Sequence, residues 1–337
     1  MPARLVKILR VNGEYMLRLY SKEPDVYHQY AALSYSWGGE QLLRTTKDNL
    51  ENHYKEIKMS SLPPTLRDVV LTIDTLALEY LWVDALCIIQ DDDHDRGPEI
   101  DMMSYVYSSA TVTIIASRAN GVYEGFLQDR PTYIFDNPNA FKMRFNCPNG
   151  LKGSLILVSA QKMTDSYDQR FSSSKEPLSR RGWALQERLA SCLILDYGTH
   201  RTFWLCRAVC TSDRNISAHD DHQLKGLWDD QFMGLGPTDL PCAVTKLGPE
   251  SSFNPETPLT LLSQEILAGL KKWNETVKEF TNKQLTFQSD RLSAIAGIAR
   301  RYQPIFQDDY LAGNLEVSTS IRASLGCSFP SKPYPRA

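Results

Sequence analysis

An acid, two arginines and a tryptophan stand close together in the stretch from Arg180 to Glu187, which reads Arg-Arg-Gly-Trp-Ala-Leu-Gln-Glu. Glu187 follows Trp183 by one helical turn, so a helix would place both side chains on the same face. A carboxylate in a dry pocket stabilises a developing positive charge, and arginine binds phosphate. Glu187 is therefore the candidate catalytic group, and Arg181, Trp183 and Gln186 are candidate substrate-binding residues. The alternative is a glutamate on a solvated helix face or one that pairs with Arg181.

Other polar candidates lie within or just after apolar runs of the chain. Ser36, Trp37 and Gly38 end the run that starts at Tyr30; here a glycine lets the backbone approach a phosphate and an indole stacks on a base. A turn whose tryptophan covers the core is the alternative. Asp84 interrupts a second apolar run, and a buried acid requires a hydrogen-bond partner. We expect Asp84 to fix the loop beside Trp37 rather than to react, and we count it, like the other three, as a substrate-binding candidate.

The pattern of apolar residues predicts the scaffold that positions these candidates. Apolar runs at residues 30–37, 81–89 and 111–116 indicate strands, and the segments between them have helical spacing. After an interruption the pattern resumes with a helix near residues 183–190 and strands at 192–197 and 202–206. This alternation predicts an α/β fold with a mainly parallel sheet and helices on both faces. Ligands bind at the carboxyl ends of the strands in such sheets.

Proline and serine mark where the helices are expected to begin. The first helix is predicted to open at Ser61 with Pro63 and Pro64, and the second at Pro98 with Glu99. Near the C-terminus, Ser289 is expected to cap another helix.

The chain divides into two expected regions. Residues 1–210 form the first domain, with a β-hairpin at 4–20 and an insertion at about 121–178 that contains an antiparallel hairpin. Residues 211–337 form a mainly helical region packed on it, whose first part, 211–258, is expected to be loop or linker and whose first long helix spans about 262–280.

The composition excludes several classes of protein. A net charge of −3 gives no basic field for a nucleic-acid partner. Seven cysteines without a CxxC pair indicate reduced thiols. Since no apolar run reaches the length of a membrane span, we expect a cytoplasmic protein without one.

The motifs of several enzyme classes are missing from the sequence. It contains no GxGxxG, GxxxxGK[ST], HExxH or GxSxG pattern. Cys206 and Cys210 have no second pair of ligands, so we expect no metal site. We expect no bound cofactor either. A serine, histidine and aspartate triad assembled in space remains open, because triads are not read from sequence order.

Five stretches together resemble the HET (heterokaryon incompatibility) domain of filamentous fungi, in order and in spacing. The stretches are Tyr30-Ala-Ala-Leu-Ser-Tyr-Ser-Trp-Gly, Leu62-Pro-Pro-Thr-Leu-Arg-Asp, Leu81-Trp-Val-Asp-Ala-Leu-Cys-Ile-Ile-Gln-Asp-Asp, the Glu99 to Ala110 segment with Met102 and Tyr107, and Arg181-Gly-Trp-Ala-Leu-Gln-Glu. The resemblance implies a cytoplasmic effector of self/non-self recognition and innate immunity that drives growth arrest or cell death. It also implies a protein partner in incompatibility signalling.

HET domains are similar to TIR domains, some of which cleave NAD. Ala32-Leu-Ser-Tyr resembles the first TIR strand, and Trp183-Ala-Leu-Gln-Glu187 resembles the TIR helix that carries the catalytic glutamate. Ala184 and Arg188 stand where that helix has cysteine and leucine. The resemblance implies a TIR-like or flavodoxin-like sheet, self-association, and NAD or a related nucleotide as substrate.

Cleavage of the nicotinamide-ribose bond requires little acid catalysis, because nicotinamide leaves as a neutral base. Stabilisation of the ribosyl cation matters most, and one carboxylate near the ribose hydroxyls supplies it. We therefore interpret Glu187 as the catalytic group of an NAD glycohydrolase. Two other interpretations stay open: a non-enzymatic module that signals death by binding a partner, and a scaffold diverted to another small-molecule reaction.

Overall fold

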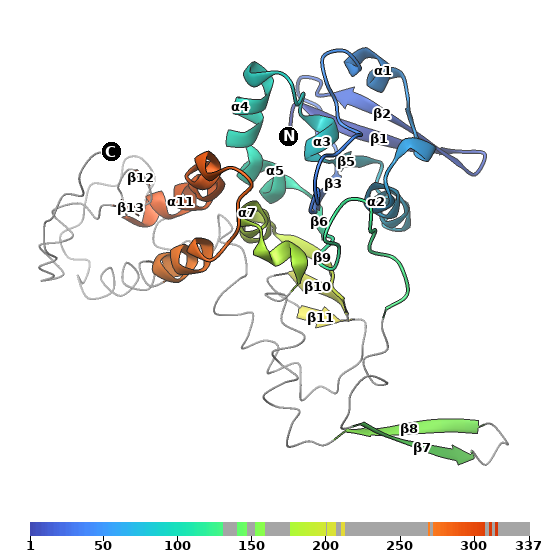
Figure 1. Ribbon diagram of the computed structural model, residues 1–337. Coiled ribbons are helices and arrows are strands. Elements are labelled where there is room, and N and C mark those ends of the chain that lie inside the picture. The colour runs from blue at the N-terminus through green and yellow to red at the C-terminus, as the bar shows by residue number, and fades with distance from the viewer. Residues whose placement is uncertain are drawn as a thin grey trace, which may run out of the picture.

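The structure is a computed structural model that describes residues 1–130, 140–146, 152–158, 176–199, 201–206, 210–212, 269, 272–306, 310–311 and 314–315. Its centre is a nine-stranded sheet in the order β11-β10-β9-β6-β3-β5-β1-β2-β4 (Figure 1). The strands are β1 (Arg4–Val11), β2 (Glu14–Ser21), β3 (Tyr30–Ser34), β4 (Ile57–Lys58), β5 (Tyr80–Trp82), β6 (Val112–Ile115), β9 (Leu193–Tyr197), β10 (Thr202–Cys206) and β11 (Cys210–Ser212).

The four central strands of the sheet are parallel. β3 pairs in parallel with β5 on one side and β6 on the other, and β6 pairs in parallel with β9. The outer strands are antiparallel. In chain order the parallel strands lie as 2-1-3-4, the order of a flavodoxin-like sheet, in which the connections switch direction between the first and third strands. The predicted α/β fold is thus confirmed, and the switch point lies between β3 and β6.

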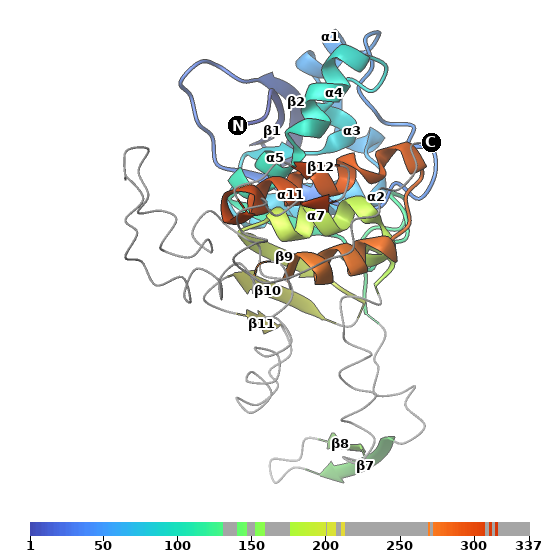
Figure 2. The ribbon, with the colours of Figure 1, turned by 90° about the vertical axis from the view of Figure 1, so that its left-hand side faces the viewer.

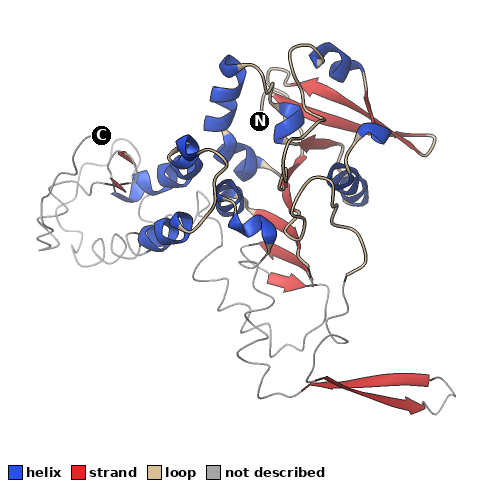
Figure 3. Ribbon diagram, viewed as in Figure 1, coloured by secondary structure: helices blue, strands red, loops and turns tan. Residues whose placement is uncertain are grey.

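Helices cover both faces of this sheet (Figures 1 and 3). Helix α2 (Pro64–Thr75) lies on one face, whereas α5 (Met103–Ser109) and α7 (Gly182–Ala190) lie on the other. The remaining described helices near the sheet are α1 (Leu50–Lys55), the 3-10 helix η1 (Met59–Ser61), α3 (Asp84–Cys87), α4 (Asp93–Asp101) and the 3-10 helix η4 (Pro177–Arg180).

A C-terminal annex, which we define as residues 272–306, packs against α7 from outside (Figure 2). Residues 272–281 are helical. They are followed by a 3-10 helix, η5 (Gln288–Arg291), and by α11 (Ser293–Phe306). Short strands follow at β12 (Tyr310–Leu311) and β13 (Asn314–Leu315).

Two sequence predictions of hairpins are confirmed. β1 and β2 pair over their whole length around Asn12 and Gly13, whose φ angles of 52° and 88° suit a tight hairpin turn. In the insertion, β7 (Ala140–Asn146) pairs antiparallel with β8 (Lys152–Val158). Most of 211–258, predicted as loop or linker, lies outside the described residues, although 211 and 212 belong to strand β11.

The strand predicted at residues 81–89 is wrong beyond Trp82. The chain turns into α3 at Asp84, whose carboxylate accepts a hydrogen bond from the Ala85 amide at 2.7 Å. The Arg4 guanidinium binds the carbonyl of Cys87 at 2.8 Å, at the end of this helix. Buried apolar residues alone do not separate a short helix from a strand.

Two predicted helix starts are also wrong. The second helix begins at Asp93, five residues before Pro98, because Asp92 caps it by accepting a hydrogen bond from the amide of His94 at 3.2 Å. At the C-terminal end, α11 begins after η5, and Ser289 lies inside η5. Pro64, by contrast, is the first residue of α2, although Ser61 belongs to a separate 3-10 turn, η1.

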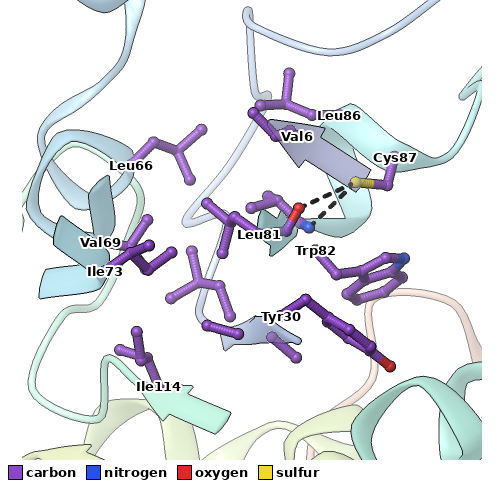
Figure 4. Close-up of a cluster of buried hydrophobic side chains, with 14 of the residues drawn as sticks. Val6, Tyr30, Leu66, Val69, Ile73, Leu81, Trp82, Leu86, Cys87 and Ile114 are labelled. Atoms are coloured by element: carbon purple, nitrogen blue, oxygen red, sulfur yellow. Dashed lines mark hydrogen bonds between the residues drawn. The ribbon is translucent and has the colours of Figure 1, made fainter. Parts of the chain in front are cut away.

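The core lies between the sheet and α2, and is completed by α3 and α5 (Figure 4). Cys87 is fully buried there, and its Sγ accepts a hydrogen bond from the Val83 amide at 3.4 Å and donates to the Leu81 carbonyl at 3.8 Å. Burial raises the pKa of this thiol to about 12. It is therefore a protonated packing residue.

Within the part of the chain that the structure describes, none of the helices has both the length and the apolar character of a membrane span.

The loops that follow β3 and β6 touch at two glycines. Gly38 has φ +71°, and a Cβ built on it would lie 2.5 Å from the Cα of Gly121. The Val122 amide binds the Trp37 carbonyl at 3.2 Å beside this contact. The space that a side chain of residue 38 would need is thus filled by Gly121. A glycine is required at position 38 because two backbone segments cross at the switch point with no room for a side chain.

We expect Gly38→Ala to lower the free energy of unfolding by roughly 2–4 kcal/mol, because it combines a left-handed backbone with a steric clash. Urea unfolding measures this change. Gly39→Ala is the matched control, since Gly39 has φ +142° but nothing within 4 Å of an added Cβ. A loss at Gly38 no larger than the loss at Gly39 would contradict the packing argument.

Candidate functional site

The Glu187 side chain points from α7 to the carboxyl end of β3. Its Oε2 accepts a hydrogen bond of 2.5 Å from Oγ of Ser34, the last residue of that strand. Glu187 is only 7% exposed and Ser34 only 1%. A glutamate on a solvated helix face, one alternative from the sequence, is therefore excluded.

Burial raises the pKa of Glu187 from the ordinary value of 4.5 to about 7. The hydrogen bond from Ser34 and the positive charge of Arg181 oppose this rise, and the negative charge of Asp84 adds to it. The Tyr107 hydroxyl, which donates to the Leu33 carbonyl at 3.0 Å, also lowers the pKa of the acid. A carboxyl group with such a pKa is partly ionised at neutral pH, as a group that accepts protons or faces a cation needs to be.

Asp84 lies past the end of β5, the strand next to β3, so both acids stand at the same edge of the sheet. Its Oδ2 accepts a hydrogen bond from the Trp37 indole nitrogen at 3.0 Å. The prediction that Asp84 fixes the loop beside Trp37 is thus confirmed. Burial raises the pKa of Asp84, while Arg181 lowers it.

Arg181 interacts electrostatically with both acids of the site, Asp84 and Glu187. Its guanidinium donates a hydrogen bond to the Tyr35 carbonyl, in the loop after β3. The positive charge lowers the pKa of both Asp84 and Glu187. The guanidinium therefore ties α7 to the loop that carries Trp37 and supplies a positive charge that acts on both carboxyl groups.

The other predicted site residues are distributed on two sides of α7. Ser36 and Trp37 are half-buried and Gly38 is exposed, all in the loop after β3. Trp183 is half-buried and packs against both the central core and the annex cluster. Gln186 faces the annex, where its Oε1 accepts a hydrogen bond from the Gly297 amide at 3.1 Å. The structure therefore brings Trp37, Asp84, Arg181 and Glu187 together and directs Gln186 elsewhere.

Three residues of the site were missed from the sequence: Ser34, Tyr35 and Tyr107. Ser34 carried a usable signal, because a serine inside an apolar strand needs a partner just as Asp84 does. The Tyr35 hydroxyl donates a hydrogen bond to Oε1 of Gln41 at 2.7 Å. Burial and the negative charge of Asp84 raise the pKa of this hydroxyl. Tyr107 stands in one of the stretches that resemble the HET domain, but it was not named as a site candidate, because it occupies an apolar position of a predicted amphipathic helix.

No group of three or more metal-binding side chains occurs among the residues that the structure describes. The cluster therefore offers, for a ligand, two carboxyl groups of raised pKa, one guanidinium and the indole of Trp37.

The flavodoxin-like order and the buried acids define an α/β protein with a candidate site at the carboxyl edge of its sheet. Residues 30–187 match the family model described as "Heterokaryon incompatibility protein (HET)". This segment is a HET domain, and it contains Ser34, Asp84, Arg181 and Glu187. No curated protein and no solved structure matches the chain.

The raised pKa of Glu187 makes stability depend on pH with a definite sign. The folded protein holds this proton more tightly than the unfolded chain, so its contribution to stability is complete below pH 4.5 and is lost as the pH rises to about 7. Glu187→Gln keeps an acceptor for Ser34 but does not titrate. The unfolding free energy of the native protein, relative to this variant, should fall by about 3 kcal/mol between pH 4 and pH 8.

Urea unfolding of both proteins at the two pH values measures this difference, and other titrating groups cancel in the comparison. A difference that stays constant between pH 4 and pH 8 would show that Glu187 titrates as an exposed glutamate does.

Proposed function

We propose that this chain is a HET-domain effector of incompatibility and innate-immune cell death that cleaves NAD at the nicotinamide-ribose bond. The observation that carries the proposal is the buried carboxyl group of Glu187 at the carboxyl edge of the parallel strands. This group accepts a hydrogen bond from Ser34 and interacts electrostatically with the Arg181 guanidinium. That edge is where α/β sheets bind nucleotides. NAD is the substrate and not a cofactor.

In the proposed reaction, the bond between the ribose C1′ and the nicotinamide nitrogen breaks, and nicotinamide leaves with the electron pair. The ionised Glu187 accepts hydrogen bonds from the ribose hydroxyls and stabilises the cation at C1′. Water then adds to C1′ and loses a proton, which gives ADP-ribose. Because little proton transfer to the leaving group is needed, one carboxylate suffices.

The substrate-binding part of the proposal uses the residues that lie around this acid. Arg181 binds the diphosphate of NAD, so that the negatively charged phosphates take the place of the two carboxyl groups as partners of the guanidinium. The indole of Trp37, held by Asp84, stacks on a ring of the nucleotide. Ser36 and Gly38 lie in the same loop as Trp37, and Trp183 belongs to the same helix as Glu187, so the proposed site includes them. Gln186 is left out because its side chain binds the annex.

Purified Glu187→Gln protein should release nicotinamide from NAD at least about 100-fold more slowly than the native chain, since it loses the charge that stabilises the cation. The measurement is nicotinamide formation followed by chromatography. Glu51→Gln is the control, because Glu51 is an exposed helix residue.

Equal turnover by the Glu187→Gln and native proteins would remove Glu187 from the mechanism. No release by the native protein, at any concentration tested, would refute NAD cleavage itself.

A second candidate function is a non-enzymatic module that signals by binding a partner. It is favoured by one observation: the Glu187 carboxyl is only 7% exposed and already has an internal partner in Ser34. In that case Glu187 stabilises the fold, and native protein leaves NAD intact while still triggering growth arrest in cells.

Self-association belongs to the enzymatic proposal, because the similarity to TIR domains implies an activity that depends on assembly. The rate per chain should fall on dilution through the range in which oligomers dissociate, as light scattering and nicotinamide release measured on the same samples would show. A constant rate per chain in samples shown to be monomeric would separate activity from assembly.

A further inference from the structure

Helix α7 is held by the annex at its start, its middle and its end. At the start, the Gly182 amide binds the Gln284 carbonyl at 2.8 Å and the Gln284 amide binds the Arg180 carbonyl at 2.6 Å. These two bonds form a parallel bridge between Arg181 and Gln284. Arg181 is the arginine of the candidate site, so the annex is bonded to the backbone on both sides of it.

In the middle of α7, the hydrogen bond from Gly297 to Gln186 joins two buried residues. A Cβ on Gly297 would lie 2.7 Å from the Cβ of Ser104 in α5 and 2.8 Å from Oε1 of Gln186. Three helices, α5, α7 and α11, therefore meet at Gly297 with no space for a methyl group. A cavity large enough for about one water molecule lies beside this contact, lined in part by Ser104, Gln186 and Gly297.

At the end of α7, the Arg301 guanidinium donates to the carbonyls of Leu189 and Ala190 at 3.2 and 3.1 Å. The last carbonyls of a helix have no partner within it, so these bonds replace water. Leu185 and Leu189 add apolar contact. They pack with annex residues Trp273, Phe280, Ala294, Ile295, Ile298, Ala299 and Tyr302.

Adjacent residues of α7 thus bind opposite partners. Gln186 binds the annex, and Glu187, about 100° further round the helix, binds Ser34 at the sheet. A nine-residue helix is too short to be stable alone, so its place is set by what it packs against. A shift of α11 at Gly297 would therefore act on the helix that carries Glu187.

We infer that the annex positions Glu187, with Gln186 and Gly297 as the positioning residues that transmit the place of α11 to the acid. The HET segment ends at residue 187, so this device lies largely outside the matched segment. The consequence for catalysis rests on the proposed function of Glu187, whereas the mechanical coupling does not.

The inference is tested in the full chain with Gly297→Ala, which places a methyl group against Ser104 and Gln186, and with Gln186→Met, which removes the acceptor for the Gly297 amide. Ser293→Ala, at an exposed position of the same helix, is the control. Hydrogen exchange of the α7 amides reports on the helix. Carbon-13 NMR titration of labelled glutamate, assigned with Glu187→Gln, reports on the acid.

Both variants should exchange the α7 amides about tenfold faster or more. Both should also lower the pKa of Glu187 by about half a unit or more, because a loosened helix admits water to the carboxyl. Ser293→Ala should change neither. If Gly297→Ala fails to fold, Gln186→Met decides.

Folded variants with native α7 exchange and native Glu187 titration would overturn the inference, even if the native chain cleaves NAD. A native chain that leaves NAD intact, with both shifts present in the variants, would refute the proposed function and support the positioning role.

Discussion

The hydrogen bond between Ser34 and Glu187 joins the central strand of the sheet to the helix that closes its edge. It also allows a carboxyl group to be buried at all, since an acid removed from water needs a donor and a nearby positive charge. Ser34 supplies the first, and Arg181 supplies the second while holding the loop after β3. β3, the loop after it and α7 are therefore held together by the interactions of Ser34, Glu187 and Arg181, and the position of each element depends on the other two.

Around these interactions the structure joins segments that are far apart in the sequence. Asp84 begins α3, just past the end of the second parallel strand, and Trp37 lies in the loop that meets Gly121. Tyr107 comes from α5, which lies on the same face of the sheet as α7. The parallel sheet makes this possible, because the carboxyl ends of β3 and β5 meet at one edge. Polar residues that follow the ends of different parallel strands therefore come together at this edge, even when they are far apart in the sequence.

The sequence allowed the sheet, the hairpins and the pairing of Asp84 with Trp37 to be predicted, because each has a local signal. Strands buried on both sides read as apolar runs, Asn12-Gly13 marks a turn, and an acid inside an apolar run demands a partner. The signals failed where two structures share one pattern. Residues 85–87 continue the apolar run of the strand before them, yet they belong to the helix α3.

The residues of the candidate site divide in the same way. Glu187 and Arg181 stood out because the acid follows Trp183 by one helical turn and two arginines come just before it, whereas Gln186 was misplaced because sequence spacing does not say which side of α7 faces the sheet. That assignment depends on Gly297 in the annex, 111 residues after Gln186, and no local sequence pattern indicates it. Tyr107 was missed for a related reason: its hydroxyl matters only through the Leu33 carbonyl and the acid beside it.

The matched segment stops at residue 187, but helix α7 continues to Ala190 and is bonded along its length to residues 272–306. An exchange of the matched segment with that of another HET domain at this boundary would therefore cut α7 and remove its contacts with the annex. A chimera that keeps the annex from one parent and takes the segment from another inherits mismatched neighbours at Ser104, Gln186 and Gly297. A segment transferred to another protein would therefore need to include both the matched residues and the annex, 272–306, to keep α7 in place.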